Sequence, residues 1–131
     1  MKYAFTATFT PFEDGTGYEC RIPDIPHCVT SGRDIVDAMA MIQDAASAML
    51  LVYEDDQMDI PVARKPDEVT APEGGFTSLV IIDTDAYRRA NETRAVKKTV
   101  SIPAWMADQA ERQGVSLSQV LQETLRARFG V

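Results

Sequence analysis

Hydrophobic and polar residues alternate at the start of the chain, and this pattern predicts strands. Residues 2–10 place aromatic and small apolar side chains on one face and mostly polar ones on the other, as in a half-buried strand. The cluster 13–17, with two glycines, predicts a turn, and residues 18–22 then repeat the alternation to give a hairpin. Two prolines within 23–26 break the ladder, and residues 28–30 could form a short third strand.

After Arg33 the apolar residues recur every three or four positions, which predicts a helix. Asp34 and Asp37 resemble a capping box at its start. Its apolar stripe is about twenty residues long and consists of Ile35, Ala38, Met39, Ile42, Ala45, Ala46, Met49 and Val52. The acidic run 54–56 should end the helix, because negative charge opposes the dipole there. Residues 57–75, rich in proline and glycine, predict a loop.

Residues 79–82 are continuously apolar, which is typical of a strand that is buried on both faces and central in its sheet. The order strand, helix, strand implies a right-handed parallel crossover. A short helix is expected at 84–91. The predicted domain is therefore 1–90, followed by a linker at 91–96.

The tail predicts one strand at 96–102 and two helices. Pro103 begins the first helix and Gly114 ends it, while Ser116 to Gln119 form a capping box for the second. A lone strand in a segment of this length has no pairing partner and cannot bury a core. Two copies repair both defects, because their strands can form an antiparallel ribbon above intertwined helices. Residues 97–131 therefore predict a ribbon-helix-helix dimer whose ribbon enters the DNA major groove.

Each residue type in the tail suits one of three roles. Lys97, Thr99 and Ser101 would face outward and read base edges. Phosphates would be bound by Lys98 and by the free N–H groups of Ser116, Leu117 and Ser118 at the start of the second helix. The dimer core would contain Val100, Ile102, Trp105, Met106, Val120, Leu121 and Leu125. The alternative is an ordinary edge strand and helical hairpin packed on the first domain.

Charge separates the two parts of the chain more sharply than the net value of −7 over 131 residues suggests. Residues 1–93 carry seven Lys and Arg against seventeen Asp and Glu, whereas residues 94–131 carry six against three. The first part suits a basic protein and the tail suits phosphates. No apolar run approaches the length expected of a bilayer span, and two cysteines exclude a disulfide scaffold and fit a reducing cytoplasm.

At these positions the sequence resembles the HicB antitoxins of HicAB toxin–antitoxin systems. The resemblance covers nearly the whole chain and lies in the following segments: Gly17-Tyr18, Ile22-Pro23-Asp24-Ile25-Pro26-His27-Cys28, Leu79-Val80-Ile81-Ile82-Asp83, Tyr87, Val96-Lys97-Lys98-Thr99-Val100-Ser101-Ile102-Pro103-Ala104-Trp105 and Ser118-Gln119-Val120-Leu121-Gln122-Glu123. His27 stands where the family usually has glycine. The helix at 104–113 is about a turn shorter than in many ribbon-helix-helix proteins.

The resemblance implies an α+β protein. It implies a partial, non-catalytic RNase H-like domain (β-β-β-α-β) that binds and neutralises a HicA toxin, a small basic RNA-cleaving protein. It also implies a ribbon-helix-helix tail that forms a homodimer, or a dimer of dimers, and represses its own operon by binding the operator. No cofactor, metal or membrane role is expected.

Catalytic and metal-binding alternatives have weaker support in the residues. An RNase H-like nuclease needs clustered carboxylates, and the first strand has none, although Asp24 and Asp83 could be tested. Cys20, His27 and Cys28 lack a fourth zinc ligand and a paired Cys-x-x-Cys spacing. The other loop carboxylates are expected to be solvated: Glu13, Asp14, Glu54, Asp55, Asp56 and Asp59. A dimeric regulator with a ligand-sensing first domain also remains open.

Overall fold

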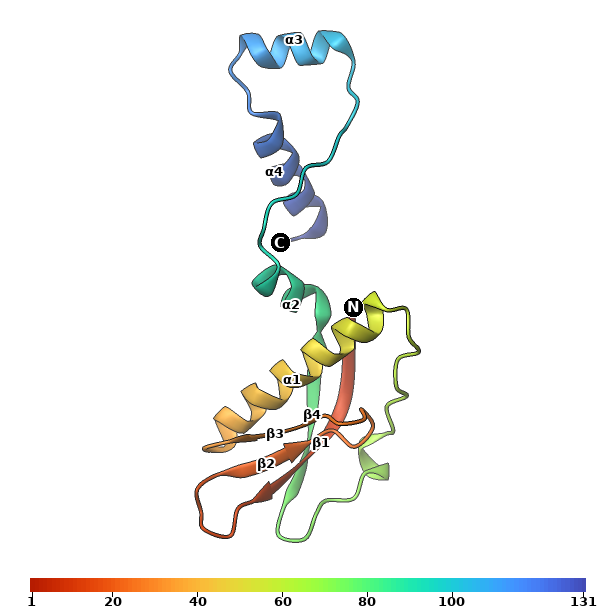
Figure 1. The fold of residues 1–131 in the computed structure, drawn as a ribbon, viewed down its shortest axis with the longest axis vertical. Coiled ribbons are helices and arrows are strands. Elements are labelled where there is room, and N and C mark those ends of the chain that lie inside the picture. The colour runs from red at the N-terminus through yellow and green to blue at the C-terminus, as the bar shows by residue number, and fades with distance from the viewer. The chain divides into compact units, whose positions relative to one another are not determined.

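The chain folds into two compact units, Met1–Arg94 and Ala95–Val131. The computed structural model describes residues 1–131 (Figure 1). The first unit is a four-stranded sheet with helices, and the second contains two helices. Each unit is considered by itself below.

The sheet of the first unit is antiparallel throughout. Its strands are β1 (Lys2–Pro11), β2 (Tyr18–Arg21), β3 (Val29–Gly32) and β4 (Phe76–Asp83), in the order β3-β2-β1-β4. The strands predicted in this unit are confirmed, but the predicted parallel crossover is wrong, because β4 runs antiparallel to β1. The physical reason is the long connection after the helix, which takes the chain back along the helix before β4 begins (Figure 1). This connection contains one short 3₁₀ turn, η1 (Pro66–Glu68).

Strand β4 lies at the edge of the sheet, so the prediction of a central strand is also wrong. Val80 and Ile82 are buried, as the apolar pattern requires. Leu79 and Ile81, on the other face, are 51% and 53% exposed. The strand therefore has apolar residues on two faces, but the single chain covers only one of them.

Helix α1 (Ile35–Asp55) crosses one face of the sheet and contributes four of the thirteen residues of the hydrophobic core (Figure 1). Its buried stripe is Ala38, Ile42, Ala46 and Leu50, which pack with Phe5, Phe9, Ile22, Ile25, Val80 and Ile82. By length and composition α1 could cross a membrane, contrary to the sequence expectation. The stripe packed on the sheet identifies it instead as the core helix of this unit.

Helix α1 begins as predicted but ends later. The Asp34 carboxylate accepts from the Asp37 amide at 2.8 Å, whereas the Asp37 carboxylate accepts from the Arg33 amide and does not close a box on Asp34. Glu54 and Asp55, expected beyond the helix, form its last turn. Both carboxylates pair with Arg88, which offsets their unfavourable interaction with the helix dipole.

The turn between β2 and β3 contains an unusual backbone conformation. The amide of Cys28 donates to the carbonyl of Ile25 at 3.2 Å, and His27 has φ of 64°. Residues other than glycine seldom adopt this left-handed conformation. Glycine, which is usual at this position in the family that the sequence resembles, would adopt the backbone conformation of His27 without strain.

The second unit consists of α3 (Ala104–Arg112) and α4 (Leu117–Phe129). Gly114 has φ of 67°, and its amide donates to Glu111 while that of Val115 donates to Ala110, which is a Schellman motif. The Ser116 hydroxyl accepts from the Gln119 amide, but the Gln119 side chain bonds Glu123, so only half of the predicted capping box forms.

Candidate functional site

The second unit has no buried residue in the single chain. Every residue predicted for a dimer core is exposed: Val100, Ile102, Trp105, Met106, Val120, Leu121 and Leu125. Trp105 is 62% exposed, whereas a side chain of this size normally packs when a partner surface is present. By itself, therefore, this unit leaves its hydrophobic stripe unpartnered.

The segment ahead of α3 has no helix or strand, so the strand predicted at 96–102 does not form in the single chain. It contains Lys97, Lys98, Thr99 and Ser101, and all four are exposed. None of their side chains makes a hydrogen bond or ion pair within the chain. A strand needs a neighbour to pair with, and these residues have none in one copy. The side chains predicted to read bases (Lys97, Thr99 and Ser101) and to bind phosphate (Lys98) therefore have no partner within the chain.

The start of α4 offers free backbone donors. The amides of Ser116, Leu117 and Ser118 have no acceptor within the chain, while the amides of Gln119 and Val120 bond Ser116. Free amides at a helix N-terminus attract anions, and the phosphate-binding role of these three amides stays a prediction.

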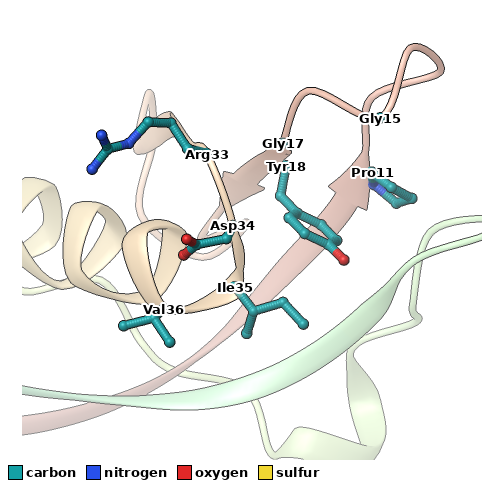
Figure 2. A pocket seen from close by; sticks show the side chains of 8 residues that line it. All are labelled: Pro11, Gly15, Gly17, Tyr18, Arg33, Asp34, Ile35 and Val36. Carbon is teal, nitrogen blue, oxygen red and sulfur yellow. The ribbon is translucent and has the colours of Figure 1, made fainter.

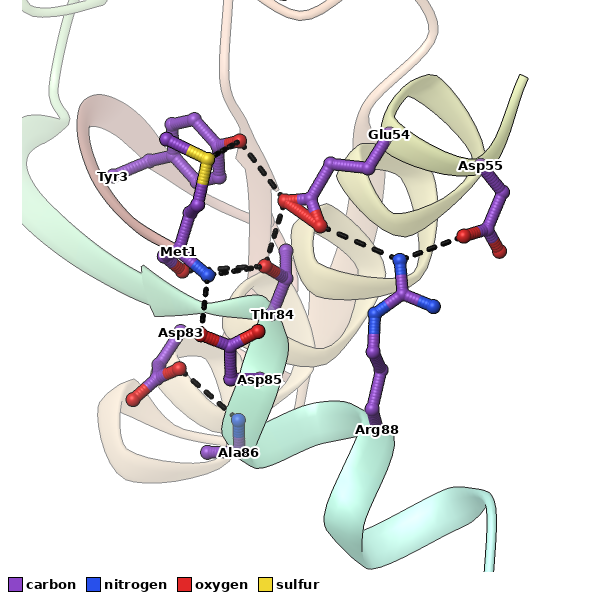
Figure 3. A network of polar contacts seen from close by, with 9 residues as sticks. All are labelled: Met1, Tyr3, Glu54, Asp55, Asp83, Thr84, Asp85, Ala86 and Arg88. Atoms are coloured by element: carbon purple, nitrogen blue, oxygen red, sulfur yellow. Dashed lines mark hydrogen bonds and ion pairs between the residues drawn. The ribbon is translucent and has the colours of Figure 1, made fainter. Parts of the chain in front are cut away.

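In the first unit, Glu54 is the centre of a network of polar contacts that joins three elements (Figure 3). One carboxylate oxygen accepts from the Tyr3 hydroxyl at 2.9 Å and from the Thr84 hydroxyl at 2.7 Å. The other faces the Arg88 guanidinium, 3.4 Å away, and Asp55 lies 2.7 Å from the same guanidinium. Arg88 and Thr84 belong to α2 (Thr84–Asn91), so the network fastens α2 to α1 and β1.

The prediction that Glu54 is a solvated loop charge is therefore wrong, whereas Asp55 is exposed as predicted but lies in the last turn of α1 and not in a loop. Burial alone would raise the pKa of Glu54, but the hydrogen bonds from Thr84, Tyr3 and Arg88 outweigh it and the pKa falls below its usual value. Sequence reasoning missed Thr84 and Arg88, because no local pattern relates them to a carboxylate thirty residues away.

The two carboxylates considered for a nuclease are both engaged in structural contacts. Asp24 accepts from the amide and the Nε of Arg64, at 2.8 and 2.7 Å. Asp83 caps α2 by accepting from the Ala86 amide at 3.0 Å, and this bond lowers its pKa. No group of three His, Cys, Asp or Glu side chains is placed to hold a metal ion. The geometry favours structural roles for both.

The two cysteines are buried and unbridged. Burial raises the pKa of Cys20 to about 11 and also raises that of Cys28. His27 is exposed, whereas both thiols are enclosed in the core. Protonated thiols in an apolar setting pack as small hydrophobic groups, which is the interpretation favoured by the sequence.

One hollow of about 420 Å³ lies between the β1–β2 turn and the start of α1 (Figure 2). Pro11, Tyr18, Ile35 and Val36 give it apolar walls, with Arg33 nearby. Val36 is 80% exposed, so the hollow is a shallow surface feature and does not enclose a ligand.

Comparisons with known proteins agree on one family. The model of the family described as "HicB_like antitoxin of bacterial toxin-antitoxin system" matches residues 5–127. Antitoxin HicB 2 of Photorhabdus laumondii is 28% identical over 86 residues, which are 64% of this chain and 62% of that protein. The matched part is thus less than two thirds of the length of this curated relative.

Solved structures share the fold. A chain of a toxin–antitoxin complex from Streptococcus pneumoniae has a TM-score of 0.59 at 22% identity, covering 98% of this chain and 99% of that one. The antitoxin HicB of Burkholderia pseudomallei has a TM-score of 0.55 at 21% identity, covering 94% and 96%. The family model spans almost the entire sequence and both of its units. The chain therefore belongs to the HicB-like antitoxins of bacterial toxin–antitoxin systems.

Proposed function

We propose that this antitoxin neutralises a basic, RNA-cleaving toxin of the HicA type by direct binding and represses its own operon by binding operator DNA. The unit Met1–Arg94 would bind the toxin, and the unit Ala95–Val131 would dimerise and bind DNA as a ribbon-helix-helix domain. Both activities are binding, without a catalytic step, and both would take place in the cytoplasm.

The observation that carries the proposal is the exposed hydrophobic stripe of the second unit. A segment of this length with no buried residue cannot be stable alone, because it pays the full entropy of ordering without burying apolar surface. A second copy offers the same stripe and can bury both. The unpaired segment before α3 then gains an antiparallel neighbour, which would turn Lys97, Thr99 and Ser101 toward one face.

That face has the chemistry of DNA recognition. Lysine donates to guanine, and hydroxyl groups can serve several bases. Lys98 and the free amides at the start of α4 would bind phosphates on either side. The net charge of +3 on residues 94–131 favours such contacts.

The first unit has the opposite character. Its net charge of −10 over residues 1–93 would repel nucleic acid and attract a basic protein. Helix α1 contributes four acidic residues and no basic one. An acidic surface that covers the RNA-binding surface of a toxin would exclude RNA by both occupancy and charge. The similarity to a chain solved in a toxin–antitoxin complex supports a toxin partner.

The DNA assignment is tested with Lys97→Ala combined with Thr99→Ala in a gel-shift assay on the DNA upstream of the operon. We expect operator affinity to fall at least about 30-fold, since each lost base contact costs about 1–3 kcal/mol. Rescue of cells from the toxin should remain. Arg126→Ala, which removes one positive charge from the end of α4, is the control and should change affinity much less. Unchanged operator affinity in the double variant would refute the ribbon.

The wild-type affinity should also fall steeply with salt, because phosphate contacts release counterions. Toxin neutralisation is tested by expressing the chain with the small basic protein encoded beside its gene. Failure to form a complex with that protein or to restore growth would refute the antitoxin assignment to this partner.

A further inference from the structure

Helix α1 carries a second apolar stripe that the single chain leaves uncovered. Five of its 21 residues are buried, although the helix is apolar enough to cross a membrane. The second stripe lies on the side away from the buried one, and its members are Met41, Ala48, Leu51 and Val52. Met41 is 42% exposed and Val52 is 53% exposed. A soluble helix that is apolar on two sides normally packs against a partner on each side, so this outer face lacks one.

Carboxylates recur along the same outer face. Asp37, Asp44 and Asp55 are seven and eleven residues apart, which is close to two and three helical turns, so they lie in line. Asp37 pairs with Arg33, and Asp55 pairs with Arg88 (Figure 3). Asp44 is exposed and has no ion pair or side-chain hydrogen bond within the chain. The outer face of α1 is therefore apolar and acidic, with a free carboxylate at its centre.

A groove between α1 and α2 opens beside Asp44, and its polar side chains offer acceptors. It has a volume of about 420 Å³, and no basic side chain lines it. The Gln43 side-chain amide already donates to a backbone carbonyl of β4 at 2.6 Å. The Asn91 side-chain amide likewise donates to the Tyr87 carbonyl at 2.9 Å. The acceptors that remain include the Asp44 carboxylate and one oxygen of Asp83, whose other oxygen caps α2.

An arginine side chain suits this groove. The guanidinium has five donors and no acceptor, pairs with carboxylates and stacks on aromatic rings, and the Tyr87 ring lines the groove. Its aliphatic stem can lie along the apolar stripe next to Asp44. Lys2 and Arg89 lie near Asp83. No cation pairs with Asp44 within the chain, so Asp44 is the carboxylate that a partner would engage.

We propose that the basic toxin docks on the outer face of α1 and places an arginine in the groove between α1 and α2. This inference rests on the proposed function and names the surface that performs it. Surfaces that bind RNA are rich in Lys and Arg, whose apolar stems and charged ends match a face that is both apolar and acidic. A second copy would bring its own carboxylates against Asp44 and be repelled. Nucleic acid would be repelled by the net charge of −10 on residues 1–93.

Charge reversal at the centre of the face tests the docking. On the immobilised basic protein encoded beside the gene, Asp44→Lys should raise the dissociation rate at least about 30-fold, because a charge pair inside an interface acts on dissociation. The matched control is Glu73→Lys, which changes the net charge equally at an exposed residue in the turn before β4. This control should slow association and leave dissociation within about threefold of the wild-type rate. Equal dissociation rates of the two variants would overturn the proposal.

Truncation of the exposed stripe tests its apolar part. Met41→Ala combined with Val52→Ala should weaken toxin binding about tenfold, because both side chains would lose contacts that are buried in the complex. Met58→Ala combined with Val62→Ala removes the same two side-chain types from the loop after α1, where they are 50% and 87% exposed. This second pair should change the affinity less than about twofold. Losses of the same size in the two pairs would also overturn the proposal.

The outcomes separate this docking surface from the proposed function. An unchanged circular dichroism spectrum shows that each variant is folded, as expected for substitutions at exposed positions. A wild-type chain that does not bind the toxin would refute the proposed function and the docking surface with it. Wild-type binding that survives both Asp44→Lys and the Met41 and Val52 double variant would overturn the docking surface alone. If these variants keep toxin binding but change the mass of the antitoxin assembly, the face belongs to a second copy, which also overturns the proposal.

Discussion

Replacement of Glu54 by glutamine tests whether the network at the end of α1 holds the first unit together. The substitution keeps the shape of the side chain but removes its charge. Glu54 is 17% exposed and accepts from two hydroxyls on one oxygen and from Arg88 on the other. Glutamine can accept at one oxygen only, so its amide nitrogen must face either the hydroxyls or the guanidinium.

The expected loss follows from these contacts. A hydrogen bond to a charged acceptor contributes about 1.5–3 kcal/mol, against about 1 kcal/mol for a neutral one. The Arg88 contact is long, and Arg88 keeps Asp55 as a partner at 2.7 Å, so it contributes little to the difference. The two hydroxyl bonds dominate. We expect Glu54→Gln to lower the free energy of unfolding by about 1–2 kcal/mol at pH 7.

The difference should depend on pH in a defined direction. In the folded chain the pKa of Glu54 is lower than its usual value of 4.5. A lowered carboxyl pKa stabilises the fold above the unfolded-state value, and this stabilisation is lost as pH falls through the folded-state value. The gap between wild type and Glu54→Gln should therefore be full at pH 6–7 and shrink below about pH 4.5.

Urea denaturation followed by circular dichroism measures the free energy of unfolding of the first unit. Tryptophan fluorescence is unsuitable, because Trp105 lies in the other unit. Asp56→Asn is the matched control: Asp56 follows Asp55 at the end of α1, is exposed, and its side chain makes no bond within the chain. Equal stability of Glu54→Gln and wild type at pH 7 would refute the reasoning. A gap that stayed constant down to pH 3 would refute the role of charge.

Two further substitutions test the turns of the sheet. His27→Gly should raise the free energy of unfolding by about 0.5–1 kcal/mol, because glycine adopts the φ of 64° without strain, whereas His27→Ala should not raise it. Equal thermal stability of the two variants would contradict the strain at this position. Gly17→Ala should lower the free energy of unfolding by about 1–3 kcal/mol, because a Cβ there would lie 2.1 Å from the Gly32 carbonyl oxygen. Gly15→Ala, with open space around the Cβ, should lower it less, and equal losses in urea denaturation would argue against the close approach at Gly17.

Much of the fold could be predicted from local pattern. The alternation at 2–10 and the three-to-four period after Asp34 predicted β1 and α1 because each element buries one face, and burial imposes its own period on the sequence. The candidate site was less accessible. For Ala95–Val131 the tail motif predicts a DNA-binding face and a dimer core, and both stay predictions. The network around Glu54 was missed, because its members are far apart in the sequence.

The sequence by itself determined most of the elements and the charge asymmetry, because each depends on composition or on neighbours a few residues apart, and it predicts a second copy for the tail. The tertiary structure decided what depends on distant contacts. The connection after α1 could return the chain to either end of the sheet, and only packing settled that β4 lies antiparallel beside β1. An apolar run does not show whether a strand is covered on both faces or leaves one face exposed, since the residue pattern is the same in both cases. The exposed side chains of Leu79 and Ile81 distinguish them here.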